Sequence, residues 1–115
     1  MSNTFIFHNP RCSKSRRTLE ILKGTGLDFE IRLYLEDPPN ANELDNLLQL
    51  LEMEPRSLMR TDEDEYDINN LENQQDRNML IQAMVSHPIL IQRPIVVHNS
   101  KARIGRPPES VLEIL

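Results

Sequence analysis

Two hydrophobic periods follow each other at the start of the chain, and they predict a strand and then a helix. β-branched and aromatic residues at 4–8 (TFIFH) predict the first strand, which the Asn9-Pro10 turn signal ends. The segment 13–23 predicts a helix that Ser13 can cap and that stops at the glycines that follow. The apolar side chains on one side of this helix are Leu19, Ile21 and Leu22.

A second strand and the clearest helix come next. Apolar residues alternate with mostly polar ones over 27–35, which predicts a strand that ends before the prolines of Asp37-Pro38-Pro39. Asn40 and Glu43 have the spacing of a capping box and predict the start of a helix. Its apolar face repeats at helical intervals through Leu44, Leu47, Leu48 and Leu51.

The rest of the chain predicts further helices, then a hairpin and a terminal helix. The acidic stretch 61–67 is typical of a solvated turn or short helix, and 74–86 predicts another helix. The inward residues of that helix are Leu80, Ala83 and Met84. Two apolar runs, 95–98 and 102–105, flank Asn99-Ser100-Lys101 and predict an antiparallel hairpin. Pro107-Pro108 predicts the start of a helix, since proline is tolerated in a first turn.

The order of these elements predicts the fold class. A strand, a crossover helix and a strand imply a parallel pair, and the closing hairpin makes the sheet mixed. This is the α/β arrangement of thioredoxin-like (glutaredoxin-like) folds, a mixed β-sheet flanked by helices with a helical insertion after strand two. The 115 residues predict a single domain, 1–115, large enough for one hydrophobic core.

Net charge and cysteine content exclude several classes of function. Lys and Arg number 13 against 18 Asp and Glu, and the net charge of -5 argues against attraction to nucleic acid or to acidic membranes. No apolar stretch approaches the roughly 20 residues of a membrane span, and the first residues do not resemble a leader, so we expect a cytoplasmic protein. One cysteine allows no intramolecular disulfide, and we expect no metal site.

That cysteine, Cys12, is the candidate nucleophile. It lies between the first strand and the first helix, where unpaired N–H groups and the helix dipole stabilise a thiolate. The cations beside it in sequence are Arg11, Lys14, Arg16 and Arg17. His8 could support the thiolate, hydrogen-bond the loop or be only a polar neighbour. Ser15 could donate its hydroxyl to the sulfur, cap the helix or face solvent. The alternative is that Cys12 is a small buried core residue.

Several separated motifs together resemble one family. HNPRCSKSRRTLEIL, LYLEDPP, SLMR, HPILIQRPIVV and ARIGRPPESVLEIL occur in that order. The chain resembles the arsenate reductases that depend on glutathione and glutaredoxin, and in particular their shorter housekeeping branch. The resemblance implies that Cys12 attacks arsenate or a similar oxyanion, and that Arg60, Arg93 and Arg106 hold it. By themselves these arginines would be interpreted as surface cations. Pro94 is implied to be the cis-proline beside the active cysteine.

The resemblance also implies partners. Glutathione is expected as co-substrate and glutaredoxin as the protein that resolves the mixed disulfide, with no bound cofactor. Two other hypotheses stay open. One is an interaction module like the Spx-type regulators, which share the fold and bind RNA polymerase. Those usually carry a Cys-x-x-Cys pair, whereas Ser15 occupies the second position here. The other is a general thiol reductase acting on glutathione mixed disulfides.

Overall fold

The computed structural model describes residues 3–115, so the first two residues of the predicted 1–115 domain lie outside the described residues. Contacts divide the chain into two compact units. Met1–Asp37 and Arg93–Leu115 form the first, which we call the sheet unit, and Pro38–Gln92 forms the second, the helical unit. That the chain is a single domain stays a prediction.

The sheet unit contains a four-stranded mixed sheet in the order β2-β1-β3-β4. Its strands are β1 (Thr4–Phe7), β2 (Glu30–Arg32), β3 (Ile95–His98) and β4 (Lys101–Ile104). β1 pairs with β2 in parallel and with β3 antiparallel, and Ile6 lies opposite Ile31 on one side and Val96 on the other. The predicted parallel pair and closing hairpin are therefore confirmed.

The hairpin turn is one residue shorter than expected. Asn99 and Ser100 both have positive φ, 47° and 65°, as the two central residues of a type I′ turn require. This turn matches the twist of the strands, so Lys101 joins β4 and pairs with His98. The second strand of the hairpin begins at 101 and ends at 104, where we predicted 102 and 105.

The prediction of a strand over 27–35 was wrong in extent, because β2 covers three residues only. The carbonyl of Leu33 accepts hydrogen bonds from the N–H groups of Glu36 and Asp37, so the chain turns directly after the strand. Most of the alternating apolar side chains are exposed, Ile31 on this edge strand and Leu27, Leu33 and Leu35 on the chain before and after it. Alternation therefore indicated a strand but not a buried face.

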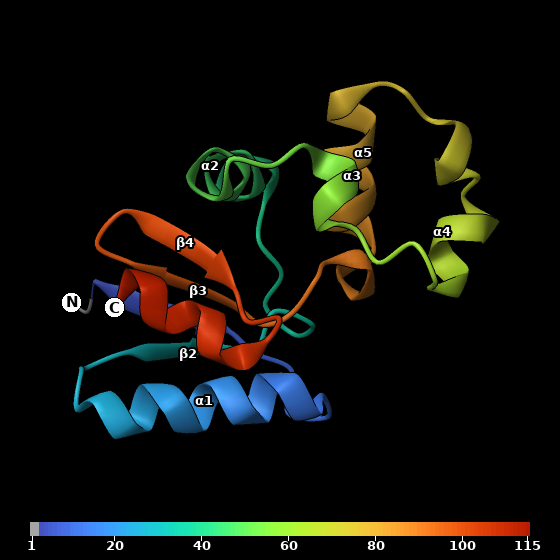
Figure 1. Cartoon of the computed structure of the whole chain (residues 1–115). Helices are drawn as coiled ribbons and strands as arrows, with labels where there is room; N and C mark the ends of the chain where they lie inside the picture. The colour runs from blue at the N-terminus through green and yellow to red at the C-terminus, as the bar shows by residue number, and fades with distance from the viewer. Residues whose placement is uncertain (1–2) are drawn as a thin grey trace. The chain divides into compact units, whose positions relative to one another are not determined.

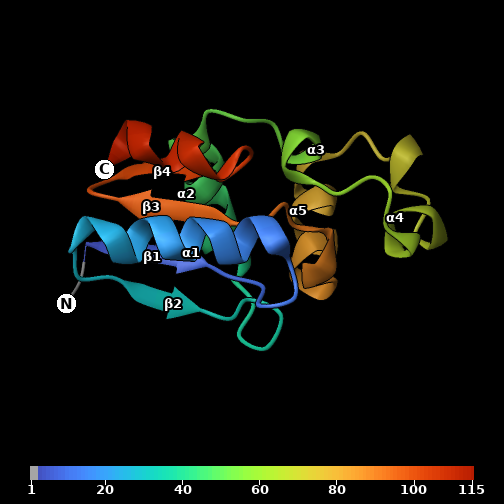
Figure 2. The same ribbon diagram turned by 60° about the horizontal axis from the view of Figure 1, so that its bottom comes forward.

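Two helices cover one face of the sheet (Figure 1, Figure 2). α1 (Ser13–Thr25) ends at Gly26, whose φ of 75° is the left-handed conformation that glycine adopts at a helix C-terminus. The terminal helix, predicted after Pro107, is the 3₁₀ helix η3 (Pro108–Ile114). The core between these helices and the sheet contains Ile6, Leu22, Val96, Val111 and Ile114, with Leu19, Ile21, Phe29 and Leu115 partly buried against it.

The helical unit is the predicted insertion after strand two. It contains α2 (Ala41–Leu51), α3 (Pro55–Leu58), α4 (Asp64–Ile68), η1 (Leu71–Asn73), α5 (Arg77–Ser86) and η2 (Pro88–Leu90). The capping box of Asn40 and Glu43 is confirmed, with both of its hydrogen bonds present. α5 begins three residues later than predicted because the side chain of Asp76 caps it, and Ile81 is buried where Ala83 is only partly so.

Within residues 3–115, no helix has both the length and the apolar character that crossing a membrane would require.

Candidate active site

Cys12 occupies the position just before α1. Its backbone is extended, with φ -96° and ψ 123°, and its carbonyl accepts the N–H of Arg16 at 3.0 Å. Cys12 therefore occupies the N-cap position of α1, and Ser13 is the first helical residue. The predicted N-cap was wrong by one position. The N-cap makes no side-chain capping hydrogen bond, and the first turn carries no acidic residue. This leaves a thiol, partly exposed, beside unpaired N–H groups.

The surroundings of the thiol favour its charged form. Burial raises the pKa of Cys12. The backbone N–H of Ser15, the Arg93 side chain and the backbone N–H of Lys14 face the sulfur and lower its pKa. The positive charge of Arg93 adds to them, and the net pKa lies below the ordinary value for a thiol. The cation that lowers this pKa therefore comes from a residue 81 positions away.

The nearby cations that the sequence suggested face other partners. Arg16 donates from Nη1 to the carbonyl of Pro10 at 3.1 Å. Arg17 pairs with Glu109 at 3.3 Å on the surface. Their proximity along the chain did not indicate contact with the sulfur.

His8, Asn9 and Ser15 form a buried hydrogen-bonded group under the cysteine loop. His8 Nδ1 and Ser15 Oγ lie 2.6 Å apart, and Ser15 Oγ accepts the N–H of Asn9 at 3.0 Å. The Ser15 side chain is fully buried, so the expectations of solvent exposure and capping were wrong. Its hydroxyl holds the loop, whereas its backbone N–H faces the Cys12 sulfur.

Asn9 is the residue that sequence reasoning missed. Its carbonyl accepts the N–H of Cys12 at 3.0 Å, and its side-chain oxygen accepts the N–H of Arg11 at 3.0 Å. The signal was present, since Asn-Pro marks a turn and asparagine commonly bonds to the backbone two residues on. We interpreted it only as the end of a strand.

The pKa of His8 is lowered by burial first, and then by the positive charges of Arg16 and Lys23. A neutral imidazole is therefore favoured beside Ser15. His8 supports the loop through this contact.

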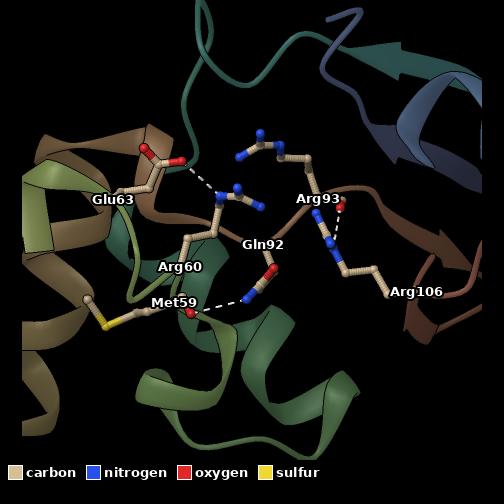
Figure 3. Close-up of polar contacts among 6 residues, drawn as sticks. All are labelled: Met59, Arg60, Glu63, Gln92, Arg93 and Arg106. Carbon is tan, nitrogen blue, oxygen red and sulfur yellow. Dashed lines mark hydrogen bonds and ion pairs between the residues drawn. The ribbon is translucent and has the colours of Figure 1, made fainter. Parts of the chain in front are cut away.

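Arg93 and Arg106 come together in the sheet unit, and Figure 3 shows Arg106 directed at the main chain of Arg93. Arg106 Nε donates to the Arg93 carbonyl at 2.9 Å. The Arg93–Pro94 peptide bond is cis, as the resemblance implied for Pro94. The sheet unit thus brings Cys12, Arg93 and Pro94 to one place, with Arg106 bonded to that segment.

Arg60 belongs to the helical unit. Its Nε pairs with Glu63 Oε1 at 3.0 Å (Figure 3). Its backbone N–H donates to the carbonyl of Leu90. Next to it, Gln92 Nε2 donates to the Met59 carbonyl at 3.2 Å. The relation of Arg60 to Cys12 stays a prediction.

The part of the chain that the structure describes contains no group of three or more His, Cys, Asp or Glu side chains placed to hold a metal ion.

Comparison with known proteins identifies the family. The chain is 55% identical over 112 residues to the uncharacterized protein YfgD of Escherichia coli, covering 96% of this chain and 94% of that protein. It is 44% identical over 115 residues to the arsenate reductase of Haemophilus influenzae, covering 98% and 99%. The structure of the arsenate reductase from Vibrio cholerae matches with a TM-score of 0.95 at 48% identity, over 99% of this chain and 98% of that one. This match confirms the predicted thioredoxin-like fold. A model of the ArsC family matches residues 7–114, and the chain belongs to this family, whose members include arsenate reductases.

Proposed function

We propose that this protein reduces arsenate, or a similar oxyanion, to arsenite with the Cys12 thiolate as nucleophile. The observation that carries the proposal is the surroundings of the sulfur. Two backbone N–H groups at the start of α1 and the Arg93 guanidinium face it and lower its pKa, and it is partly exposed. A thiol that is both charged and accessible is suited to nucleophilic attack. Relatives named arsenate reductase support arsenate as the substrate.

Arginines supply the oxyanion site in this proposal. A divalent oxyanion is best held by guanidinium groups, which offer charge and paired N–H donors. Arg106 uses Nε on the Arg93 carbonyl, and an arginine has five N–H donors, so the same side chain can also hold a ligand oxygen. Arg60 is the proposed third cation.

The proposed reaction balances with external thiols. The Cys12 sulfur bonds to arsenic(V), and one oxygen leaves as water after taking up protons. Glutathione then attacks the adduct, arsenic takes up two electrons and leaves as arsenite, and the two sulfurs become a mixed disulfide. Glutaredoxin reduces that disulfide and restores the Cys12 thiol. The chain contains one cysteine, so the second sulfur of each exchange comes from another molecule.

Arsenite production from arsenate, with glutathione and glutaredoxin, tests the proposal when it is measured for the wild-type protein beside Cys12→Ser. Serine is a preferred N-cap, so the variant keeps the start of α1 and serves as a folded control. We expect turnover in the wild type and none in the variant. Equal turnover in both would contradict the role of Cys12.

A wild-type protein without arsenite production would contradict the oxyanion substrate. The same samples are then assayed with a glutathione mixed disulfide. Turnover that requires Cys12 would favour the general thiol reductase. Its absence would favour an interaction module.

A further inference from the structure

Gly105 lies between Thr18 of α1 and Pro94 of the Arg93–Pro94 segment. It is buried at the end of β4, and its N–H donates to the carbonyl of Pro94 at 2.9 Å. A Cβ atom at this position would lie 2.6 Å from Thr18 Oγ1 and 2.7 Å from Pro94 Cγ. Both distances are far shorter than van der Waals contact, so only a residue without a side chain fits between these two neighbours.

Neither neighbour can move aside cheaply. Thr18 is fully buried, and its Oγ1 donates to the carbonyl of Lys14 at 2.8 Å in the preceding turn of α1. Pro94 is buried, and its ring is rigid. A side chain at residue 105 would therefore separate α1 from the Arg93–Pro94 segment.

Those two elements carry the N–H groups that face the Cys12 sulfur and lower its pKa. α1 provides the N–H groups of Lys14 and Ser15, and the segment before Pro94 provides the Arg93 side chain. Gly105 has no side chain that could act chemically on the sulfur. Because it has no side chain, Gly105 lets the N–H groups at the start of α1 and the Arg93 side chain lie close to each other.

We propose that Gly105 is a positioning residue, whose lack of a side chain lets the first turn of α1 and the Arg93–Pro94 segment close on Cys12 from two sides. The inference rests on the proposed function in that it takes Cys12 as the nucleophile. It concerns the thiolate itself, so it can be tested without arsenate.

The test is the pH profile of Cys12 alkylation by iodoacetamide in Gly105→Ala. Displaced donors stabilise the thiolate less, so we expect the midpoint to rise by about one unit or more relative to wild type. Arsenate turnover at neutral pH should fall with it. Gly24→Ala is the matched control, because a Cβ there meets nothing within 4 Å, and its midpoint should equal that of wild type.

A second variant tests the contact itself. Thr18→Ala removes the Oγ1 atom on one side of Gly105, so Thr18→Ala/Gly105→Ala should recover part of the midpoint shift seen in Gly105→Ala. If Gly105→Ala does not fold, the double variant is compared with Thr18→Ala alone. The remaining contact with Pro94 should still raise its midpoint.

The outcomes separate this inference from the proposed function. An unchanged midpoint in folded Gly105→Ala, or in the double variant relative to Thr18→Ala, overturns the positioning role even if the wild type reduces arsenate. A raised midpoint in a protein without arsenate turnover supports the positioning role while the proposed function fails.

Discussion

At the scale of single residues, the proposed oxyanion site depends on three arginines. Arg93 stabilises the thiolate and carries the carbonyl that Arg106 binds. We expect Arg93→Ala, Arg106→Ala and Arg60→Ala each to weaken arsenate binding by about 1.5–3 kcal/mol, which is roughly ten- to hundredfold. The Michaelis constant for arsenate in the glutathione and glutaredoxin assay measures this.

Lysine at the same positions should restore only part of the binding, because it lacks the planar fork of donors. Arg103→Ala is the matched control, since Arg103 pairs with Glu113 at 3.3 Å on the surface. Unchanged Michaelis constants in Arg93→Ala, Arg106→Ala and Arg60→Ala would show that these arginines do not hold the oxyanion.

His8 makes the stability of the fold depend on pH. Its pKa is lowered from 6.5 by burial and by nearby cations, so the folded state binds fewer protons than the unfolded state just below pH 6.5. The free energy of unfolding should therefore fall as the pH drops from 7 toward the folded pKa. Urea unfolding at several pH values measures the slope.

His8→Gln cannot take up this proton and should flatten the slope between about pH 7 and 5.5, where few carboxyl groups titrate. An equal slope in the variant and the wild type would show that His8 does not contribute to it.

At the scale of secondary structure elements, the capping box stabilises the N-terminus of α2. Asn40 Oδ1 accepts the N–H of Glu43 at 2.9 Å, and Glu43 Oε1 accepts the N–H of Asn40 at 3.1 Å. Asn40→Ala removes one of these bonds and should lower the free energy of unfolding by about 1 kcal/mol. Asn46→Ala, at an exposed position within the same helix, should cost nothing. Equal stability of the two variants in urea would contradict the capping role.

At the scale of the whole molecule, the single cysteine of the chain limits which oxidised species can form. Mild oxidant alone should give a sulfenic acid or a Cys12–Cys12 dimer, and added glutathione should give a mixed disulfide. Intact-mass spectrometry distinguishes the three. A folded protein whose Cys12 stays reduced under both conditions would contradict the redox role.

The division into two units makes the predicted single domain testable. The sheet unit is built from both ends of the chain, so its β1–β3 pairing closes only when the intervening residues are accommodated. We expect one cooperative transition. Tyr34 and Tyr66 are buried, one in each unit, and the chain has no tryptophan.

Tyr66→Phe leaves a tyrosine only in the sheet unit, and Tyr34→Phe leaves one only in the helical unit. In each variant the fluorescence midpoint in urea should coincide with that from circular dichroism. Separate midpoints would show two domains.

Local signals in the sequence predicted most of the elements. The capping box, the hairpin runs and the proline before the terminal helix act over a few neighbouring residues, so their patterns can be interpreted without the fold. The strand over 27–35 was wrong in extent because the chain turns at Leu33, and alternation carries no information about that turn or about what covers an edge strand.

The candidate site was likewise predictable only where it depends on neighbouring residues of the sequence. The sequence by itself determined that Cys12 precedes a helix, that no second cysteine can pair with it, and which motifs resemble arsenate reductases. Only the tertiary structure decided that Arg93 reaches the sulfur, that Ser15 bonds to His8, and that nothing larger than glycine fits at 105. The physical reason is that hydrogen bonds and steric exclusion act over a few ångströms in space. The sheet brings Arg93 and Gly105 to the cysteine from the other end of the chain, and the path of the loop decides that Ser15 meets His8.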